Sequence, residues 1–388
     1  MSARRRAGFT LVELMISLTV GAIVIMTVYT IGGASARSFQ EQQRISQLQL
    51  STRLALDRVR RDIERAGLHG TPNSSIERVC ATPPRAIRAV TLDDNAASSR
   101  GALNTYEAAG SNTTTQADLL RIVGNFVTSD AYLVRSLNGA GNVAFLQTQW
   151  QGFRRSFADV VTDPTGNTFD TELFGSVFRP GRMLHVQNMS GNHFFVTVVS
   201  ASIAGTDATV TFTPSLPVGG TCVVGLGEGS LLAPLSEVQY ELVAAPSDQR
   251  PTLDPAVTGP NVSLVRRELH MTSGAVLNER TVLEWAVHFD VDAVIDTTTA
   301  GPPDARLFTR FNDAAAEAQI TARAERVRSL IVTIGGRTPE QDPRFPWVAP
   351  AANDPLSRFR VFSSRVGAAR VRTATTEINL PNLVNRGM

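Results

Sequence analysis

Residues 8–31 read GFTLVELMISLTVGAIVIMTVYTI, and this stretch decides how the rest of the chain is organised. About 23 residues from Phe9 onward carry a single charge, that of Glu13. A helix rises roughly 1.5 Å per residue, so this one would cross the ~30 Å apolar layer of a bilayer. Basic residues beside such a segment tend to stay cytoplasmic, and three precede it: Arg4, Arg5 and Arg6. The sequence therefore predicts one membrane helix, with the bulk of the chain outside the cytoplasm.

Two ordinary kinds of targeting segment account for part of this pattern. A secretory signal peptide explains the arginines and the apolar run, but its apolar region is usually about 7 to 15 residues long and free of acid. A plain signal anchor explains the length and the orientation. It leaves Glu13 unexplained, because a carboxylate inside the apolar layer costs on the order of 2.5 to 3.5 kcal/mol on insertion scales. The acid favours a third interpretation.

The order Gly8-Phe9-Thr10-Leu11-Val12-Glu13 after a short basic leader resembles the prepilin cleavage motif of type IV pilins and of the related pseudopilins of type II secretion. The resemblance implies that a membrane-embedded prepilin peptidase cuts after Gly8. It also implies that the same peptidase methylates the new amino terminus at Phe9, and that Glu13 guides assembly.

Glu13 also has a physical reason to lie in an apolar segment. In a bundle of packed helices its carboxylate can be matched by the positive amino terminus of a neighbouring subunit. Removing an unpaired charge from lipid would then favour association. The alternative is an acid that is tolerated near the interface, about one turn into the helix, and has no role in assembly.

Composition and periodicity divide the chain into four segments. Apolar residues after the membrane stretch, such as Ile45, Val59 and Ile63, recur at helical spacings until Gly67. We expect a basic leader over 1–8, a transmembrane and assembly half-helix over 9–35, an amphipathic half-helix over 36–67, and a periplasmic β-rich globular domain over 68–388. A further division of that domain near 230–236 is left open. The expected helix is nearly 60 residues long.

The composition excludes several functions. Formal net charge is +2, so no global field recruits nucleic acid or acidic partners. Lysine is absent, which excludes a phosphate-loop lysine and a lysine Schiff base. The two cysteines, Cys80 and Cys222, permit one disulfide closing a long loop in an exported domain, or two separately buried thiols.

Strand-like segments separated by turn residues dominate the chain after the long helix. We expect strands over 119–127, 143–150, 183–187, 194–203, 208–212, 231–243 and 262–269. Residues 282–293 alternate most clearly and predict one half-buried strand, whose Glu284, His288, Asp290 and Asp292 face solvent. The predicted fold is α+β, a long N-terminal helix packed on a large, mainly antiparallel β domain.

The remaining segments predict smaller elements. Residues 71–115 are expected to be loop with one strand near 87–92. Asn312 and Asp313 open a helix filled by 314–328. The chain is then expected to close with strands over 330–334, 358–363 and 369–380.

Catalytic and metal-binding motifs are missing from the sequence. No G-x-S-x-G, H-E-x-x-H or phosphate-loop pattern occurs, and none of the five histidines has metal-ligand spacing: His69, His185, His193, His270 and His288. Asp290, Asp292 and Asp296 alternate along a strand, which favours a solvated face over a calcium loop. We expect no catalytic residue, no metal and no cofactor.

The C-terminal arginines allow contact with nucleic acid or an acidic surface. Arg358, Arg360, Arg370 and Arg372 could project from one face of a terminal hairpin and meet phosphates. The sequence places no exposed aromatic residues between them, which favours a solvated strand face instead.

A finer resemblance concerns the whole chain. The helix ending Asp62-Ile63-Glu64-Arg65-Ala66-Gly67 resembles that of PilW-type minor pilins, and the succession of strands within 231–380 resembles their sheet. Residues 71–204 depart from that pattern in length and content. The resemblance implies a minor type IV pilus subunit that acts in pilus assembly or initiation through helix packing. The alternatives are a minor pseudopilin of type II secretion similar to GspJ, and a membrane-anchored periplasmic enzyme or binding protein.

The same resemblance implies partners and a location. The partners would be the prepilin peptidase, major and other minor pilins, inner-membrane lipid and the pilus assembly platform. The protein would pass once through the inner membrane with its C-terminal domain in the periplasm, and would later reach the pilus at the cell surface.

Overall fold

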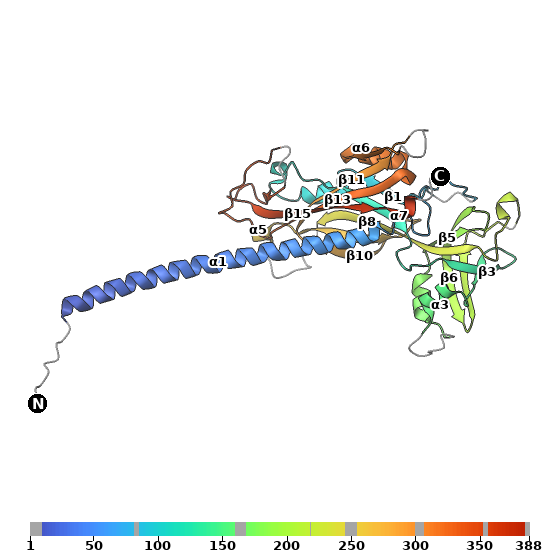
Figure 1. Cartoon of the computed structure of the whole chain (residues 1–388), viewed down its shortest axis with the longest axis horizontal. Helices are drawn as coiled ribbons and strands as arrows, with labels where there is room; N and C mark the ends of the chain where they lie inside the picture. The colour runs from blue at the N-terminus through green and yellow to red at the C-terminus, as the bar shows by residue number, and fades with distance from the viewer. Residues whose placement is uncertain are drawn as a thin grey trace, which may run out of the picture. The chain divides into compact units, whose positions relative to one another are not determined.

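A computed structural model describes residues 10–80, 85–159, 168–217, 219–244, 254–298, 306–351 and 356–384 (Figure 1). The chain forms two units, Met1–Leu50 and Ser51–Met388, and the second is called the globular unit below. Helix α1 (Leu11–Ile63) begins in the first unit and ends in the second. Among the described residues, it is the one helix that is long and apolar enough to cross a membrane.

The last turns of α1 belong to the core of the globular unit. Ala55, Val59 and Ile63, four residues apart, are almost completely buried. Side chains at this spacing lie on one face of a helix, so the amphipathic pattern buries one stripe against the sheets. The prediction of a long helix followed by a large antiparallel β domain is confirmed.

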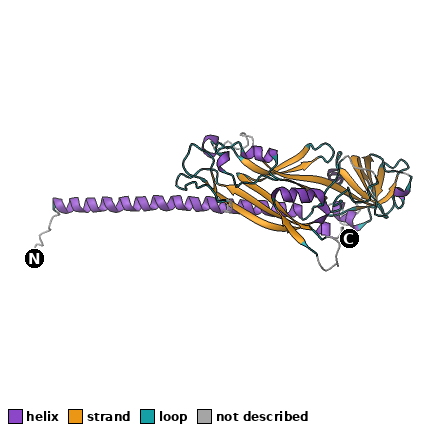
Figure 2. Cartoon of the chain, turned by 90° about the horizontal axis from the view of Figure 1, so that it is seen from above, coloured by secondary structure: helices purple, strands orange, loops and turns teal. Residues whose placement is uncertain are grey.

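Two antiparallel sheets share the main core of the globular unit (Figure 2). The first has the order β1 (Val90–Asp93), β2 (Leu119–Gly124), β8 (Leu231–Ala244), β9 (Val262–Leu269) and β10 (Val276–Leu283). The second has the order β12 (Phe308–Phe311), β11 (Ala286–Asp296), β13 (Val327–Arg337), β15 (Ala369–Asn379) and β14 (Arg358–Phe359).

The chain between β2 and β8 forms a closed barrel with its own core. Its strands are β3 (Tyr132–Leu137), β4 (Val143–Leu146), β5 (Met183–Gln187), β6 (His193–Ala204) and β7 (Asp207–Thr213). The first half of β8 pairs with both β3 and β5, which closes the ring β8-β3-β4-β7-β6-β5. Figure 1 shows these strands, in green to yellow, gathered at one end of the globular unit.

Two short helices complete the barrel core. They are α3 (Gln151–Phe157) and α4 (Thr171–Val177), which lie in sequence between β4 and β5. They bring Phe153 and Phe157 against Tyr132 and Phe174 against both of these phenylalanines, with ring centroids 4.9 to 6.0 Å apart. These aromatic side chains belong to a buried core that also holds aliphatic residues such as Leu146, Leu184 and Val196.

The remaining helices are short. They are α2 (Ala97–Leu103), α5 (Pro255–Thr258), α6 (Asp313–Ala322), α7 (Pro381–Val384) and the 3₁₀ turns Ala109–Ser111, Thr221–Val223 and Ala324–Arg326. Ala316 and Ile320 of α6 are buried in the main core.

Several expected boundaries are wrong. The 282–293 strand is two strands, because Trp285 adopts a φ of 55° and the chain changes sheet there, from β10 to β11. The expected strand over 143–150 ends at Leu146, before α3 begins at Gln151. The helix over 314–328 ends at Ala322, and β13 already begins at Val327.

Two further expectations fail at shorter segments. The 71–115 segment holds helix α2 as well as strand β1. The expected strand over 358–363 is reduced to Arg358–Phe359.

Candidate functional site

The start of α1 is a hydrogen-bonded cap formed by two side chains. The Thr10 backbone N–H and hydroxyl donate to Glu13 Oε2 at 3.0 and 2.9 Å, and the Glu13 backbone N–H donates to Thr10 Oγ1 at 3.3 Å. This reciprocal arrangement at positions i and i+3 is a capping box. Of the residues predicted from the motif, Glu13 is described, whereas Gly8, Phe9 and the leader arginines Arg4, Arg5 and Arg6 lie outside the described residues.

The apolar half of α1 satisfies its serine and threonine hydroxyls within the helix. The hydroxyls of Ser17, Thr19, Thr27 and Thr30 each donate to a carbonyl three or four residues earlier, at 2.8 to 3.0 Å. Such back-bonding removes the cost of placing a hydroxyl in lipid. Glu13 is left as the one formal charge between Leu11 and Ile31, and its side chain is exposed.

The other end of α1 is fixed to the first sheet by a polar contact in the core. Asp62 Oδ2 accepts from the Tyr240 hydroxyl at 2.6 Å and from Arg266 Nε at 2.5 Å. Burial, with the neighbouring Asp62 carboxylate, raises the pKa of Tyr240 well above its ordinary value, so this hydroxyl keeps its proton and donates. The register that pairs Tyr240 with Arg266 across β8 and β9 places both donors on the face toward α1.

The chain leaves α1 through a tightly packed turn. Gly67 has a φ of 74° and its N–H donates to Val123 O at 2.8 Å. The Asn382 side-chain amide donates to Glu64 O at 2.9 Å and to Ala66 O at 3.2 Å, which satisfies carbonyls that a helix end leaves without partners. Helix α1 ends at Ile63, before the predicted end at Gly67, and the sheet and the C-terminal segment meet the turn that follows it.

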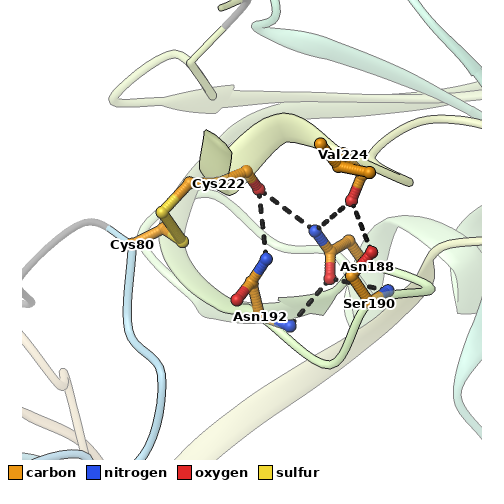
Figure 3. Close-up of a disulfide and its surroundings, with 6 residues drawn as sticks. All are labelled: Cys80, Asn188, Ser190, Asn192, Cys222 and Val224. Carbon is orange, nitrogen blue, oxygen red and sulfur yellow. Dashed lines mark hydrogen bonds between the residues drawn. A yellow bond between two sulfur atoms is a disulfide. The ribbon is translucent and has the colours of Figure 1, made fainter. Parts of the chain in front are cut away.

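Cys80 and Cys222 form a disulfide across 142 residues of chain (Figure 3). It joins the segment before β1 to the loop between β7 and β8 of the barrel. The Asn188 side-chain amide donates to Cys222 O at 3.1 Å and to Val224 O at 2.9 Å, and Asn192 Nδ2 donates to Cys222 O at 3.4 Å. The bond and these amides hold one barrel loop in a single arrangement (Figure 3).

The structure brings together two histidines that the sequence left scattered. His185 Nε2 lies 2.7 Å from His193 Nδ1, and the two buried rings stack. His193 Nε2 lies 3.7 Å from Glu77 Oε2. The signal was a hairpin register centred on Ser190, which places the two positions diagonally across β5 and β6. No group of three or more side chains with metal-binding geometry is found among the described residues.

The second face of β11 is largely covered, which corrects the expectation for its acidic residues. His288 and Asp292 are buried, and Asp290 lies in a cleft of about 430 Å³ lined by Asp290, Asp292, Arg310, Asn312 and Asp313. Helix α6 and the segment before β2 cover this face. Arg310 pairs with Asp292, and His288 Nδ1 accepts from the Gln116 N–H at 2.9 Å. The cleft is polar and open to solvent, since two of the residues that line it, Arg310 and Asn312, are exposed.

Comparison with known proteins agrees with the predicted N-terminal signal. Residues 3–29 match the prokaryotic N-terminal methylation motif. This match supports a type IV pilin or pseudopilin precursor. No curated protein and no solved structure matches the chain. The pilin motif implies processing by prepilin peptidase and assembly with other pilins, and with the apolar α1 it is consistent with membrane anchoring.

Proposed function

We propose that this chain is a minor type IV pilus subunit of the PilW type that acts in pilus assembly or initiation. Prepilin peptidase cuts after Gly8 and methylates Phe9, and the mature chain joins the filament through α1. The function is non-catalytic. The partners are the major and other minor pilins, with the pilus assembly platform, and the globular unit is periplasmic before assembly.

The observation that carries this proposal is the isolated charge of Glu13. The serine and threonine hydroxyls of the apolar segment between Leu11 and Ile31 bond within their own helix. Glu13 is the one residue of this segment whose formal charge needs a partner in lipid. The Thr10 contacts satisfy part of its hydrogen-bonding capacity but leave its charge unmatched. The amino terminus of a neighbouring, processed subunit supplies the opposite charge.

The competing explanation is that Glu13 only caps its own helix. A variant of Thr10, the partner of Glu13 in the capping box, is the control for this explanation. Thr10→Val removes the hydroxyl from the capping box and leaves the acid, whereas Glu13→Ala removes both the cap and the charge. If Glu13 pairs with a neighbouring subunit, Glu13→Ala abolishes recovery of the protein in sheared filaments while Thr10→Val retains most of it. Both variants should insert into the membrane and be processed. Equal recovery of the two variants contradicts the assembly role.

Processing has a direct readout. Mass spectrometry of the membrane form should find a chain that begins with N-methylated Phe9. A chain that begins at Met1, or one cut near Arg37, contradicts prepilin processing.

A minor pseudopilin of type II secretion, similar to GspJ, is the second candidate because the same motif serves both systems. Deletion of the gene separates them, since loss of surface pili supports the first and loss of protein secretion with normal pili supports the second. A membrane-anchored periplasmic enzyme or binding protein is the third, and it requires that Glu13→Ala leave function intact.

A further inference from the structure

The chain between β13 and β15 carries an unusual concentration of arginine and aromatic side chains. Figure 1 shows these loops, in dark orange to red, at the end of the globular unit opposite the barrel. The aromatic residues come from 345–347 and the arginines from 358–370, so the sequence separates groups that the fold brings together. The sequence-based expectation that these arginines lack aromatic neighbours is wrong.

Two arginines converge on one aromatic ring. The guanidinium carbons of Arg358 and Arg370 lie 4.5 and 4.2 Å from the centroid of the Phe345 ring. Arg358 and Arg370 are also direct cross-strand partners in the β14–β15 ladder. Like charges that face each other across a ladder repel, and Asp342, whose Oδ2 lies 3.4 Å from Arg370 Nη2, offsets part of this repulsion.

A second stack lies beside the first. The Arg360 guanidinium carbon lies 5.2 Å from the Trp347 ring centroid, and Trp347 is two residues from Phe345. The side chains of Phe345, Trp347, Arg358, Arg360 and Arg370 are called the arginine–aromatic face below. All five are partly exposed.

Polar contacts with backbone atoms hold this face in place. Gln341 Oε1 accepts from the backbone N–H groups of Val361 and Phe362 at 3.1 and 3.0 Å, and Asn112 bonds both the N–H and the carbonyl of Arg360 at 2.8 Å. Arg358 Nη1 and Arg360 Nη2 each donate once to a backbone carbonyl, at 2.8 Å. A guanidinium has five N–H donors, so each of these two side chains keeps donors for a ligand.

Among the described residues, positive charge on the face exceeds the negative charge beside it. Asp342 lies 3.4 Å from Arg370 and is half-exposed. Glu107 accepts from the hydroxyls of Ser363 and Ser364. Within the described part of the chain, neither Arg358 nor Arg360 forms an ion pair with a carboxylate, and the exposed Arg344 adds a further positive charge.

We propose that the arginine–aromatic face binds single-stranded nucleic acid. Planar guanidinium groups that are already stacked match phosphate oxygens with paired donors and lose little entropy on binding. Aromatic side chains beside them give unstacked bases a surface, and this combination is how sequence-tolerant single-strand sites are built. A duplex hides its bases, so it can use the charges but not the rings. The proposal stands on the globular unit alone and is independent of the role of Glu13.

The test uses the full chain in a non-ionic detergent and a fluorescently labelled oligothymidylate. The double variant Arg358→Gln, Arg360→Gln should weaken binding by about tenfold or more, and should reduce the slope of log K against log salt by about 1.4, because each single-strand phosphate contact contributes roughly 0.7. Trp347→Leu should weaken binding by about tenfold with the salt slope unchanged, because it removes stacking and no charge.

The matched control removes the same charge elsewhere. Arg280 and Arg323 are exposed on β10 and just after α6, so Arg280→Gln, Arg323→Gln changes the net charge equally. This control should bind as the unchanged chain does. A third variant, Arg358→Lys with Arg360→Lys, keeps the positive charge. It should bind more weakly than the unchanged chain but with the same salt slope. An unchanged slope shows that the loss of affinity is not a folding defect.

Four results overturn the proposal. The first is that the unchanged chain does not bind the oligothymidylate at low salt, and the second is that the control variant and the Arg358→Gln, Arg360→Gln variant weaken binding equally. The third is that a duplex of the same length binds as tightly as the single strand. The fourth is that a sulfated or uronate polysaccharide binds more tightly through the same residues. The last result would assign the face to an anionic polysaccharide.

Discussion

Three titratable side chains at the second face of β11 have shifted pKa values, Asp290 and His288 on the strand and Asp118 in the segment that packs on it. Burial, with the charges of Asp292 and Asp313 nearby, raises the pKa of Asp290 to about 7. Burial also raises the pKa of Asp118 to about 7, although its oxygens accept from the N–H groups of Val291 and Asn95. Burial and the charge of Arg100 lower the pKa of His288 to about 4.

The signs of these shifts determine the direction of the pH dependence. A carboxyl whose pKa is raised on folding contributes stability below its unfolded pKa, near 3.8, and loses it as the pH rises through about 7. His288 acts in the opposite direction, since its contribution is lost as the pH falls from 6.5 to about 4. The two carboxyls together outweigh the single imidazole. The net effect of these three groups is therefore that the free energy of unfolding falls as the pH rises from about 4 to about 7.

Asp290→Asn should reduce this pH dependence. Between pH 5 and pH 8 the unchanged chain should lose on the order of 2 kcal/mol of unfolding free energy more than the variant does. Denaturant unfolding of the full chain in detergent at both pH values measures the difference. Asp207→Asn, which alters an exposed carboxylate paired with Arg135, should follow the unchanged chain. Parallel pH profiles for Asp290→Asn and the unchanged chain would contradict the assignment.

Gly124 tests how closely β2 packs against the end of α1. A Cβ added there would lie 2.4 Å from the carbonyl oxygen of Arg65, a backbone atom that cannot rotate away. Gly124→Ala should lower the free energy of unfolding by about 2 kcal/mol, the usual cost of overpacking. Gly139→Ala is the control, because a Cβ there meets no atom within 4 Å. Similar losses for the two variants would show that the contact is relieved.

At the scale of the element, α1 depends on its sheet at one polar point as well as along its apolar stripe. Asp62→Ala leaves the Tyr240 hydroxyl and the Arg266 guanidinium without their shared acceptor. We expect a loss of about 2 to 3 kcal/mol in unfolding free energy, against about 1 kcal/mol for Tyr240→Phe. Asp57→Ala, on the exposed side of the same helix, should change stability by less than about 0.5 kcal/mol. A double-mutant cycle with Asp62→Ala and Tyr240→Phe measures the coupling energy between these two side chains. If the two losses of unfolding free energy are additive, the side chains are not coupled and the expectation is contradicted.

Elements with a strong period were predictable from the sequence, and those fixed by distant contacts were not. The long run of apolar residues before Ile31 and the stripe through Val59 and Ile63 determined α1. The break at Trp285 was not visible, because the alternation of residues continues through it while the partner strand changes from β9 to β13. Periodicity reports which side a residue faces and carries no information about its neighbour.

The same distinction applies to the candidate sites. Glu13 could be found because an acid in an apolar run is a local signal. The arginine–aromatic face joins Phe345 to Arg358 and Arg370 through strand pairing, and the His185–His193 contact needs the hairpin register. The polar residues of β11 were assigned to solvent because nothing in 282–293 indicates that helix α6 and residues 116–118 cover that face.

At the scale of the whole molecule, the barrel is an insertion held at two places. Its chain enters after β2 and leaves through β8, and the Cys80–Cys222 disulfide adds a covalent link to the segment before β1. Closing a loop of 142 residues stabilises a fold by up to about 5 kcal/mol in the chain-entropy model.

Cys80→Ser with Cys222→Ser should therefore destabilise the barrel more than the second sheet. We expect faster amide hydrogen exchange in β5 and β6, and little change in β13 and β15, whose partners lie within their own sheet. Exchange measured by mass spectrometry on the full chain, with and without reductant, checks this. Equal acceleration in all four strands would show that the unit opens as one body.

Strand β8 links the two cores through one uninterrupted backbone. Leu231 to Leu235 pair with barrel strand β5, while Ser236 to Ala244 pair with β2 and β9. If a ligand or surface pulls on the barrel along this strand, the load falls on the ladder of β8 in shear, so many hydrogen bonds must break together before the strand slides. A pull across the strand would instead open them one at a time. The mechanical strength of this protein should therefore depend on the direction of the applied force, which single-molecule pulling from different attachment points can measure.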